Sequence, residues 1–157
     1  MADDHLATYL NDHLAGSTIA IEHLEDLEAA AKDIAPALAE VRADIESDRN
    51  ELQELMRGLD IAESLTRRAG AWIAEKGARL KMVADDQKSG ALRRLEGLEA
   101  VALGIDGKLA LWRALNAVAE NAPALRALDF DRLTERAVNQ RERVEALRLD
   151  AARAALA

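Results

Sequence analysis

The apolar residues of this chain recur three and four positions apart, and this spacing restricts the possible folds more than any other feature. It repeats over several heptads in four long segments, residues 6–34, 38–59, 91–119 and 130–154. Residues three and four apart share one side of an α-helix, so each segment predicts a long amphipathic helix with one buried stripe. Four such helices predict an all-α bundle.

The composition agrees with one folded helical domain. Half of the 157 residues are hydrophobic and 32% are charged, which is typical of a globular chain and not of a disordered one. Aromatic residues make up only 3%, and 2 prolines and 8 glycines are few for strands and tight turns. We expect a single helical-bundle domain over residues 1–157.

Prolines, glycine and aspartates mark the expected helix ends. Pro36 stands where a first helical turn tolerates proline, so a short turn should join the first two helices as antiparallel neighbours. Gly58 is a C-terminal signal for the second helix. After a break near Pro123, either Asp129 or Asp131 can cap the last helix.

The connection between the second and third long helices leaves two topologies open. Residues 61–86 predict a weaker helix, and a 25-residue helix is about 37 Å long. A stretch of about 30 residues can carry the chain back along that length, which predicts a ferritin-like antiparallel four-helix bundle with a helical crossover connection. The alternative is a simple up-and-down bundle of five helices. We expect Trp72 and Trp112 in the core, although an exposed Trp72 would mark a protein-binding surface.

The charge is unevenly distributed along the chain. Residues 1–63 hold 16 acidic and 4 basic residues (net −12), whereas residues 67–94 hold 8 basic and 3 acidic residues (net +5). A total of −8 argues against nucleic acid as a partner, since phosphates require Lys and Arg. We expect the basic stretch to lie against the acidic first hairpin of its own chain.

Several site classes are excluded by residue content. The chain has no cysteine, which excludes disulfides, zinc–thiolate sites, iron–sulfur clusters and thiol nucleophiles. The acidic N-terminus is unlike a secretory signal, and no run of about 18 apolar residues predicts a membrane span. We therefore expect a cytoplasmic protein with no membrane partner.

A few polar residues interrupt the apolar stripes. A buried polar group costs about 1–3 kcal/mol unless it is paired, so these residues need partners. At 1.5 Å per residue, most of them fall at similar heights along the bundle, and Asp106 joins them in the crossover topology. The sequence predicts a buried polar layer near mid-bundle, formed by His13, Ser17, Asp48, Asp106 and Gln140.

Two phrases of the sequence carry a family resemblance. Asn-Asp-His-Leu-Ala-Gly at 11–16 and Gly-Ile-Asp-Gly-Lys at 104–108, followed by Leu111-Trp112, resemble a bacterial branch of the ferritin-like superfamily without a known function. The expected helix lengths and the expected crossover connection, taken over the whole chain, also resemble those of that superfamily. The resemblance implies a four-helix bundle, whose di-iron site in the superfamily requires Glu-x-x-His on two helices.

The di-iron motif is missing from this sequence. Helix 2 offers Asp48-x-x-Glu51 and the last helix offers Gln140-x-x-Arg143, and the three histidines all lie in the first helix. We therefore expect no metal, no other cofactor and no catalytic residue. Arg143 is the expected substitute for the metal, paired with Asp48 or Asp106 within the polar layer.

Two further motifs favour structural roles. His13 and Ser17 lie one turn apart, as in a nucleophile–base pair, but mid-helix they have no oxyanion hole. We expect a structural hydrogen bond between them. Gly104 to Lys108 lacks the residues of a phosphate loop, so Gly104 and Gly107 are expected to allow close approach of a neighbouring helix.

The sequence favours a non-catalytic ferritin-like bundle that acts through contacts with a protein partner or a second copy of itself. The main alternative is a metal-binding protein or metal-dependent oxidoreductase. A small-ligand carrier with a cavity beneath the crossover is a third interpretation. The alternative metal site would use mid-bundle carboxylates and one histidine, namely Asp48, Glu51, Glu99, Asp106 and His13.

Overall fold

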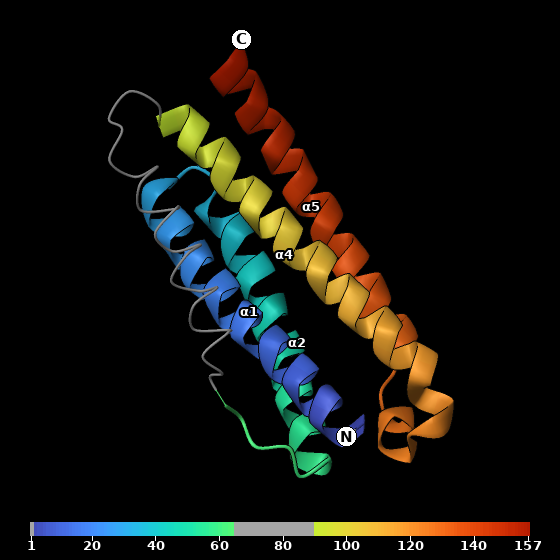
Figure 1. Cartoon of the computed structure of the whole chain (residues 1–157). Coiled ribbons are helices and arrows are strands. Elements are labelled where there is room, and N and C mark those ends of the chain that lie inside the picture. Colours follow the sequence, from blue (N-terminus) through green and yellow to red (C-terminus); the bar gives the residue numbers. More distant parts are fainter. Residues whose placement is uncertain (1, 65–89) are drawn as a thin grey trace.

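The computed structural model describes residues 2–64 and 90–157, and all regular structure in these ranges is helical (Figure 1). The all-α prediction is confirmed. None of these helices is apolar over a length sufficient to cross a membrane. The long helices are α1 (Ala2–Ala30), α2 (Ala35–Gly58), α4 (Gly90–Val118) and α5 (Phe130–Leu156), and the short 3-10 helices η1 (Ala119–Asn121) and η2 (Pro123–Ala127) join the last two.

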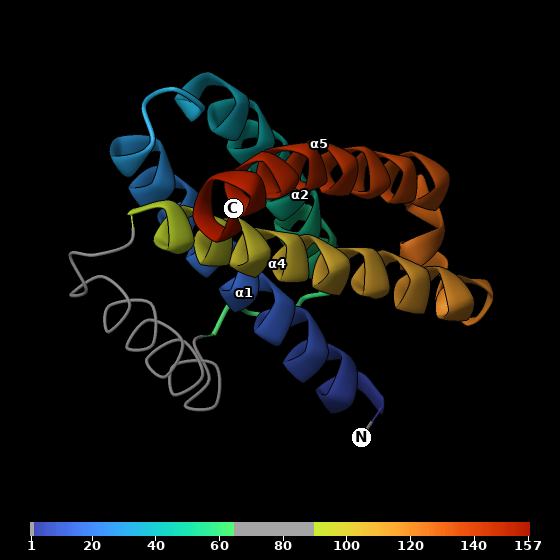
Figure 2. The same cartoon turned by 90° about the horizontal axis from the view of Figure 1, so that it is seen from above.

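Contacts at the two ends fix the directions of the helices. At one end, Arg94 near the start of α4 forms a two-bond ion pair (2.7 and 2.9 Å) with Asp33 in the α1–α2 turn. At the other end, Trp112 of α4 belongs to one cluster with Leu10 of α1 and Leu52 of α2. Helix α4 therefore runs in the same direction as α2 and antiparallel to α1 and α5 (Figures 1 and 2).

The helix directions do not decide between the two expected topologies. A crossover and a fifth, full-length helix would both return the chain from the end of α2 to the start of α4. The two topologies differ in residues 65–89, which lie outside the described residues. Trp72 and most of the weaker helix expected over 61–86 lie there too.

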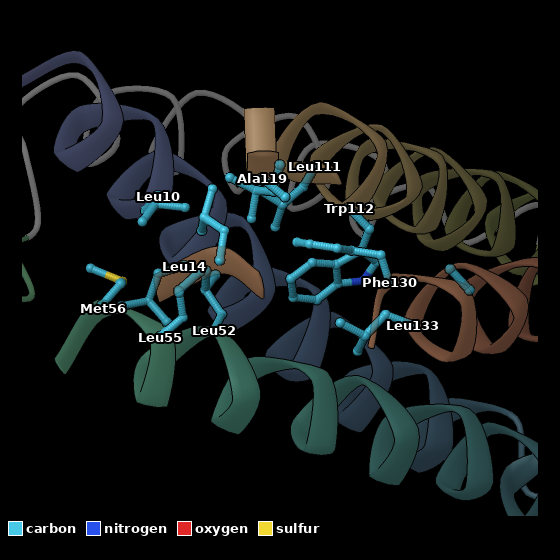
Figure 3. Packing of buried hydrophobic residues seen from close by; sticks show 13 residues of the cluster. Leu10, Leu14, Leu52, Leu55, Met56, Leu111, Trp112, Ala119, Phe130 and Leu133 are labelled. Atoms are coloured by element: carbon cyan, nitrogen blue, oxygen red, sulfur yellow. The ribbon is translucent and has the colours of Figure 1, made fainter. Parts of the chain in front are cut away.

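Two apolar clusters fill the bundle, one toward each end. The cluster in Figure 3 contains Trp112, which is 1% exposed, so its predicted place in the core is confirmed. The first cluster includes Leu10, Leu14, Leu52, Leu55, Leu111, Trp112, Phe130 and Leu133. The second cluster includes Leu24, Leu27, Leu38, Val41, Ile45, Leu98, Val101, Ile105 and Val144.

The helix starts follow the sequence signals. Pro36 lies in the first turn of α2, where no intrahelical partner for its nitrogen is needed. Of the two aspartates that could cap α5, Asp129 does so, since its carboxylate accepts a 3.0 Å hydrogen bond from the Arg132 backbone N–H.

The end of α2 differs from the expectation for Gly58. The helix ends at Gly58, but the residue in the left-handed region is Asp60, with φ 55°. The Ile61 N–H donates to the Met56 carbonyl (2.9 Å) and the Asp60 N–H to the Arg57 carbonyl (3.2 Å), which together form a Schellman motif. Asp tolerates this conformation better than most residues, so an aspartate fills the position where glycine is most common.

The glycines expected to allow close helix approach do not do so. A Cβ added at Gly104 or Gly107 would meet no atom of residues 2–64 or 90–157 within 4 Å. The close approach occurs at Gly97, where a Cβ would lie 2.7 Å from a methyl group of Leu27 in α1. The Gly97 carbonyl also lies 2.9 Å from His23 Nε2, so α1 and α4 are joined at this point by packing and by a hydrogen bond.

Candidate functional site

Five polar residues from three helices meet between the two apolar clusters. Along each helix they fall between residues that belong to opposite clusters, such as Ile45 and Leu52 on α2. Two of the five, Asp48 and Gln140, are almost completely buried, at 2% and 0% exposure. We call this group the central polar cluster; it consists of Asp48 and Glu51 from α2, Lys108 from α4, and Arg136 and Gln140 from α5.

Asp48 is the centre of the cluster, and both of its carboxylate oxygens are occupied. Its Oδ2 accepts from Lys108 Nζ (2.5 Å) and from Gln140 Nε2 (3.0 Å). Its Oδ1 accepts from Arg136 Nε (2.7 Å) and from the Nη2 of the same guanidinium. A carboxylate offers about four lone-pair sites, so the protein's own donors use them all.

Glu51 extends the cluster toward the surface. Its Oε1 accepts from Arg136 Nη2 (2.8 Å), and both of its oxygens accept from Arg132 (2.7 and 3.0 Å). The hydrogen bond from Arg132 is the main cause that lowers the pKa of Glu51. Glu51 is therefore an ionised partner for α5 and not a proton donor at neutral pH.

Lys108 brings a buried ammonium group into the cluster. Its side chain is 13% exposed, and Nζ donates to Asp48 and to the Gln140 side-chain oxygen. Burial lowers the pKa of Lys108, and the neighbouring Asp48 carboxylate opposes this shift. The ammonium group therefore depends on Asp48 for its charge compensation.

The charges within the cluster cancel. Asp48 and Glu51 supply two negative charges, and Lys108 and Arg136 supply two positive charges. Arg132, which binds Glu51 from the exposed side, adds a positive charge outside these residues. A cation such as Fe²⁺ or Mn²⁺ needs unpaired carboxylate or imidazole ligands, and the donors around Asp48 leave none at this position. The arrangement joins α2, α4 and α5 at one level.

The structure places the other residues of the predicted polar layer elsewhere. Asp106 lies at the expected height but on the outer side of α4, half exposed and 3.3 Å from Arg141. Arg143 does not reach Asp48 or Asp106, and its guanidinium pairs instead with Asp44 and Glu40 of α2. These two expectations were wrong because spacing gives the height of a residue along a helix more reliably than its direction around the axis.

His13 and Ser17 lie partly buried on α1 without bonding to each other. The Ser17 hydroxyl donates to the Leu14 carbonyl (2.6 Å), so the expected hydrogen bond to His13 is absent. The His13 ring packs edge-on against Tyr9, with ring centroids 4.6 Å apart. Burial lowers the pKa of His13, with the Asp12 carboxylate opposing.

The residues of the alternative metal site do not come together. Asp48 and Glu51 are engaged by the cations described above, whereas Glu99 and Asp106 lie on the exposed side of α4 beside Arg148 and Arg141. Among residues 2–64 and 90–157, no group of three or more His, Cys, Asp or Glu side chains is placed to hold a metal ion. The cavity of the carrier interpretation would involve residues outside these ranges.

Lys108 and Arg136 were not predicted as members of the polar layer. A usable signal was present: a buried Asp48 needs a cation, and Lys108 is the one basic residue of α4 between Arg94 and Arg113. Neither residue lies on the apolar spacing, because a long basic side chain reaches the interior from the flank of a helix.

Asn11 is buried as well as Asp48 and Gln140, but unlike them it was not predicted to be buried from the spacing of apolar residues. It is 4% exposed, and its Oδ1 accepts from the Ser64 backbone N–H (2.7 Å). Its Nδ2 donates to the carbonyls of Ala7 (2.9 Å) and Ala62 (3.2 Å). Asn11 thus attaches the segment that follows α2 to the side of α1.

Comparison with known proteins adds no relative to this geometry. Neither the known protein families, nor the curated proteins, nor the solved structures gave a match.

Proposed function

We propose that this protein is a non-catalytic ferritin-like helical bundle that acts through contacts with a protein partner or with a second copy of itself. The observation that carries the proposal is the charge-neutral central polar cluster. Lys108 and Arg136 supply, from within the chain, the positive charge that a ferritin-like di-iron site obtains from metal.

The order and packing of the helices support the ferritin-like part of the proposal. Helices α1 and α2 form one antiparallel pair and α4 and α5 form another. Each helix of one pair packs against an antiparallel helix of the other, α1 on α4 and α2 on α5. Ferritin-like bundles have two such pairs joined by one long crossover. An experimental structure in which residues 65–89 form a full-length fifth helix of the bundle would contradict the crossover.

The non-catalytic part is supported by the absence of a free reactive group at the cluster. Every carboxylate oxygen of Asp48 and Glu51 accepts a hydrogen bond from a cationic or amide donor of the chain. A general base or a metal ligand would need one of these oxygens.

Elemental analysis of the purified protein tests the proposal. After expression in medium that contains iron, manganese and zinc, and purification without chelators, we expect far less than one metal ion per chain. The matched control is Lys108→Met, which removes one positive charge and one of the two donors to Asp48 Oδ2, while Gln140 still donates to that oxygen. About one transition-metal ion per wild-type chain would overturn the proposal and favour the oxidoreductase.

A further inference from the structure

The outer side of α4 is an exposed apolar surface in the middle of a charged molecule. Leu103 is 66% exposed, although it lies near the centre of the helix. Helix α4 packs against α1 and α5, and Leu103 lies on the side of α4 that neither of these helices covers. We call this surface the outer α4 face; its residues alternate three and four apart and are Ala100, Leu103, Gly107, Ala110, Ala114 and Ala117.

Nothing within the described chain accounts for this composition. Among the described residues, a Cβ at Gly107 would meet nothing within 4 Å, so the glycine makes no room for any of the described helices. Glycine is a poorer helix former than alanine, and a leucine that stays exposed to water contributes no hydrophobic stabilisation. Small residues at heptad spacing allow the backbone of a second helix to approach closely.

The charges beside the outer α4 face can pair with the same charges on a second copy related by a two-fold axis. Arg113 is exposed and has no ion-pair partner among the described residues. Glu99 lies on the same flank two heptads earlier, where it is 48% exposed and its Oε1 lies 3.3 Å from Arg148 of α5. In an antiparallel pair of α4 helices with a two-fold axis near Gly107, Arg113 of each copy faces Glu99 of the other. Asp106, which then lies near the axis, is compensated by Arg141 of its own chain.

We propose that a second copy of this chain docks on the outer α4 face, antiparallel and with its two-fold axis near Gly107. Leu103 of each copy then packs against Gly107 and Ala110 of the other, along a seam of about 26 Å from residue 100 to residue 117. A two-fold contact uses the same patch on both copies, as this self-complementary surface requires. The inference rests on the proposed function, of which it names the partner.

Sedimentation equilibrium tests the contact directly. We expect the wild type to reach twice the 17.1 kDa of one chain with rising concentration, and Leu103→Glu to raise the dissociation constant at least 100-fold. Leu156→Glu is the matched control, because Leu156 is 73% exposed at the far end of α5 and should leave the dimer unchanged. Circular dichroism of both variants verifies folding, which an exposed position should not disturb.

The orientation is tested by cross-linking, since the chain contains no cysteine. Gly107→Cys should form a disulfide-linked dimer under mild oxidation. A mixture of Leu103→Cys and Ala110→Cys chains should cross-link to each other more than either chain does to itself. Arg113→Glu should weaken the dimer about tenfold, and adding Glu99→Arg should restore it.

Two results would overturn the inference without touching the proposed function. One is a wild type that stays monomeric at every concentration, with a lower unfolding temperature for Leu103→Glu, as expected if residues 65–89 of the same chain cover this face. The other is a dimer that Leu103→Glu does not weaken, which would place the contact elsewhere. Failure of the proposed function is read separately, as stoichiometric metal in the elemental analysis.

Discussion

A carboxylate in the middle of a helical bundle is stable only if its oxygens find donors, because removing an unpaired charge from water costs several kcal/mol. Asp48 meets this requirement with Lys108, Arg136 and Gln140, which all reach it from α4 and α5. The cations are held in turn by two or more acceptors each, since Lys108 also binds Gln140 and Arg136 also binds Glu51. At the scale of the residue, each charged group of the cluster is therefore paired within the chain.

His13 provides a prediction at the same scale. Burial should hold its pKa below the usual value of about 6.5. Asp12→Asn should lower this pKa further, because the Asp12 carboxylate favours the charged ring. A titration followed by NMR measures both values, and a pKa of about 6.5 or above in the wild type would contradict the burial of His13.

At the scale of the helix, spacing was sufficient to predict most of the fold. The segments 6–34, 38–59, 91–119 and 130–154 correspond to α1, α2, α4 and α5, and the aspartate cap and the proline turn lie as predicted. These features depend on local chemistry and on a periodicity that one helix carries by itself.

The spacing of apolar residues along single helices could not predict the partners of the buried polar residues. The spacing identified Asp48 and Gln140 as buried and gave Asp106 the correct height, but the rotation of α4 about its axis decides whether Asp106 or Lys108 faces the core. This rotation is set by the whole apolar surface of α4, which extends almost around the helix, and no single stripe defines it.

The glycines of α4 give a prediction for this element. Gly104→Ala should raise the free energy of unfolding by up to about 1 kcal/mol, because it adds a helix-favouring residue where no described part of the chain lies within 4 Å of the new Cβ. Gly97→Ala should lower it, since overpacking against the buried Leu27 costs about 1–3 kcal/mol, more than the helix propensity gains. Denaturant unfolding measures both, and equal stabilisation by the two changes would show that α1 and α4 do not approach closely at Gly97.

At the scale of the whole molecule, ion pairs join the helices along their length. Arg42 binds Glu28 between α1 and α2, Arg143 binds Asp44 between α2 and α5, and Arg148 binds Glu99 between α4 and α5. Such exposed pairs contribute little individually, typically about 0–1 kcal/mol each. Two other paired carboxylates, Glu51 and Glu145, make the stability of the chain depend on pH in the acidic range.

The sign of this dependence follows from the carboxylates. Arg148 lowers the pKa of Glu145 to about 2, and Arg132 lowers that of Glu51. A carboxylate with a lowered pKa stabilises the folded chain above its unfolded value of about 4.5, and this contribution is lost as the pH falls toward 2. We expect the denaturation midpoint to fall steadily from pH 5 to pH 2.5, and less steeply for Glu145→Gln. A midpoint independent of pH over this range would contradict the ion pairs.

The central polar cluster is the part of the molecule on which the account depends, and a double-mutant cycle on Asp48 and Lys108 tests it most directly. Asp48→Leu should cost about 3–5 kcal/mol, because it leaves the Lys108 ammonium buried without its carboxylate. Lys108→Met should cost about 1–3 kcal/mol, since Arg136 and Gln140 still bind Asp48.

In that cycle, the double variant Asp48→Leu with Lys108→Met should lose less stability than the sum of the two changes, by at least about 1.5 kcal/mol. The same cycle with Arg143→Met is the control and should show no coupling, because Arg143 pairs with Asp44. The free energies of unfolding of these variants give the coupling energies of Asp48 with Lys108 and with Arg143. Strong coupling of Asp48 to Lys108 and none to Arg143 is the predicted result. Coupling near zero in the Lys108 cycle would mean that Lys108 does not compensate the Asp48 carboxylate, which would contradict the central polar cluster.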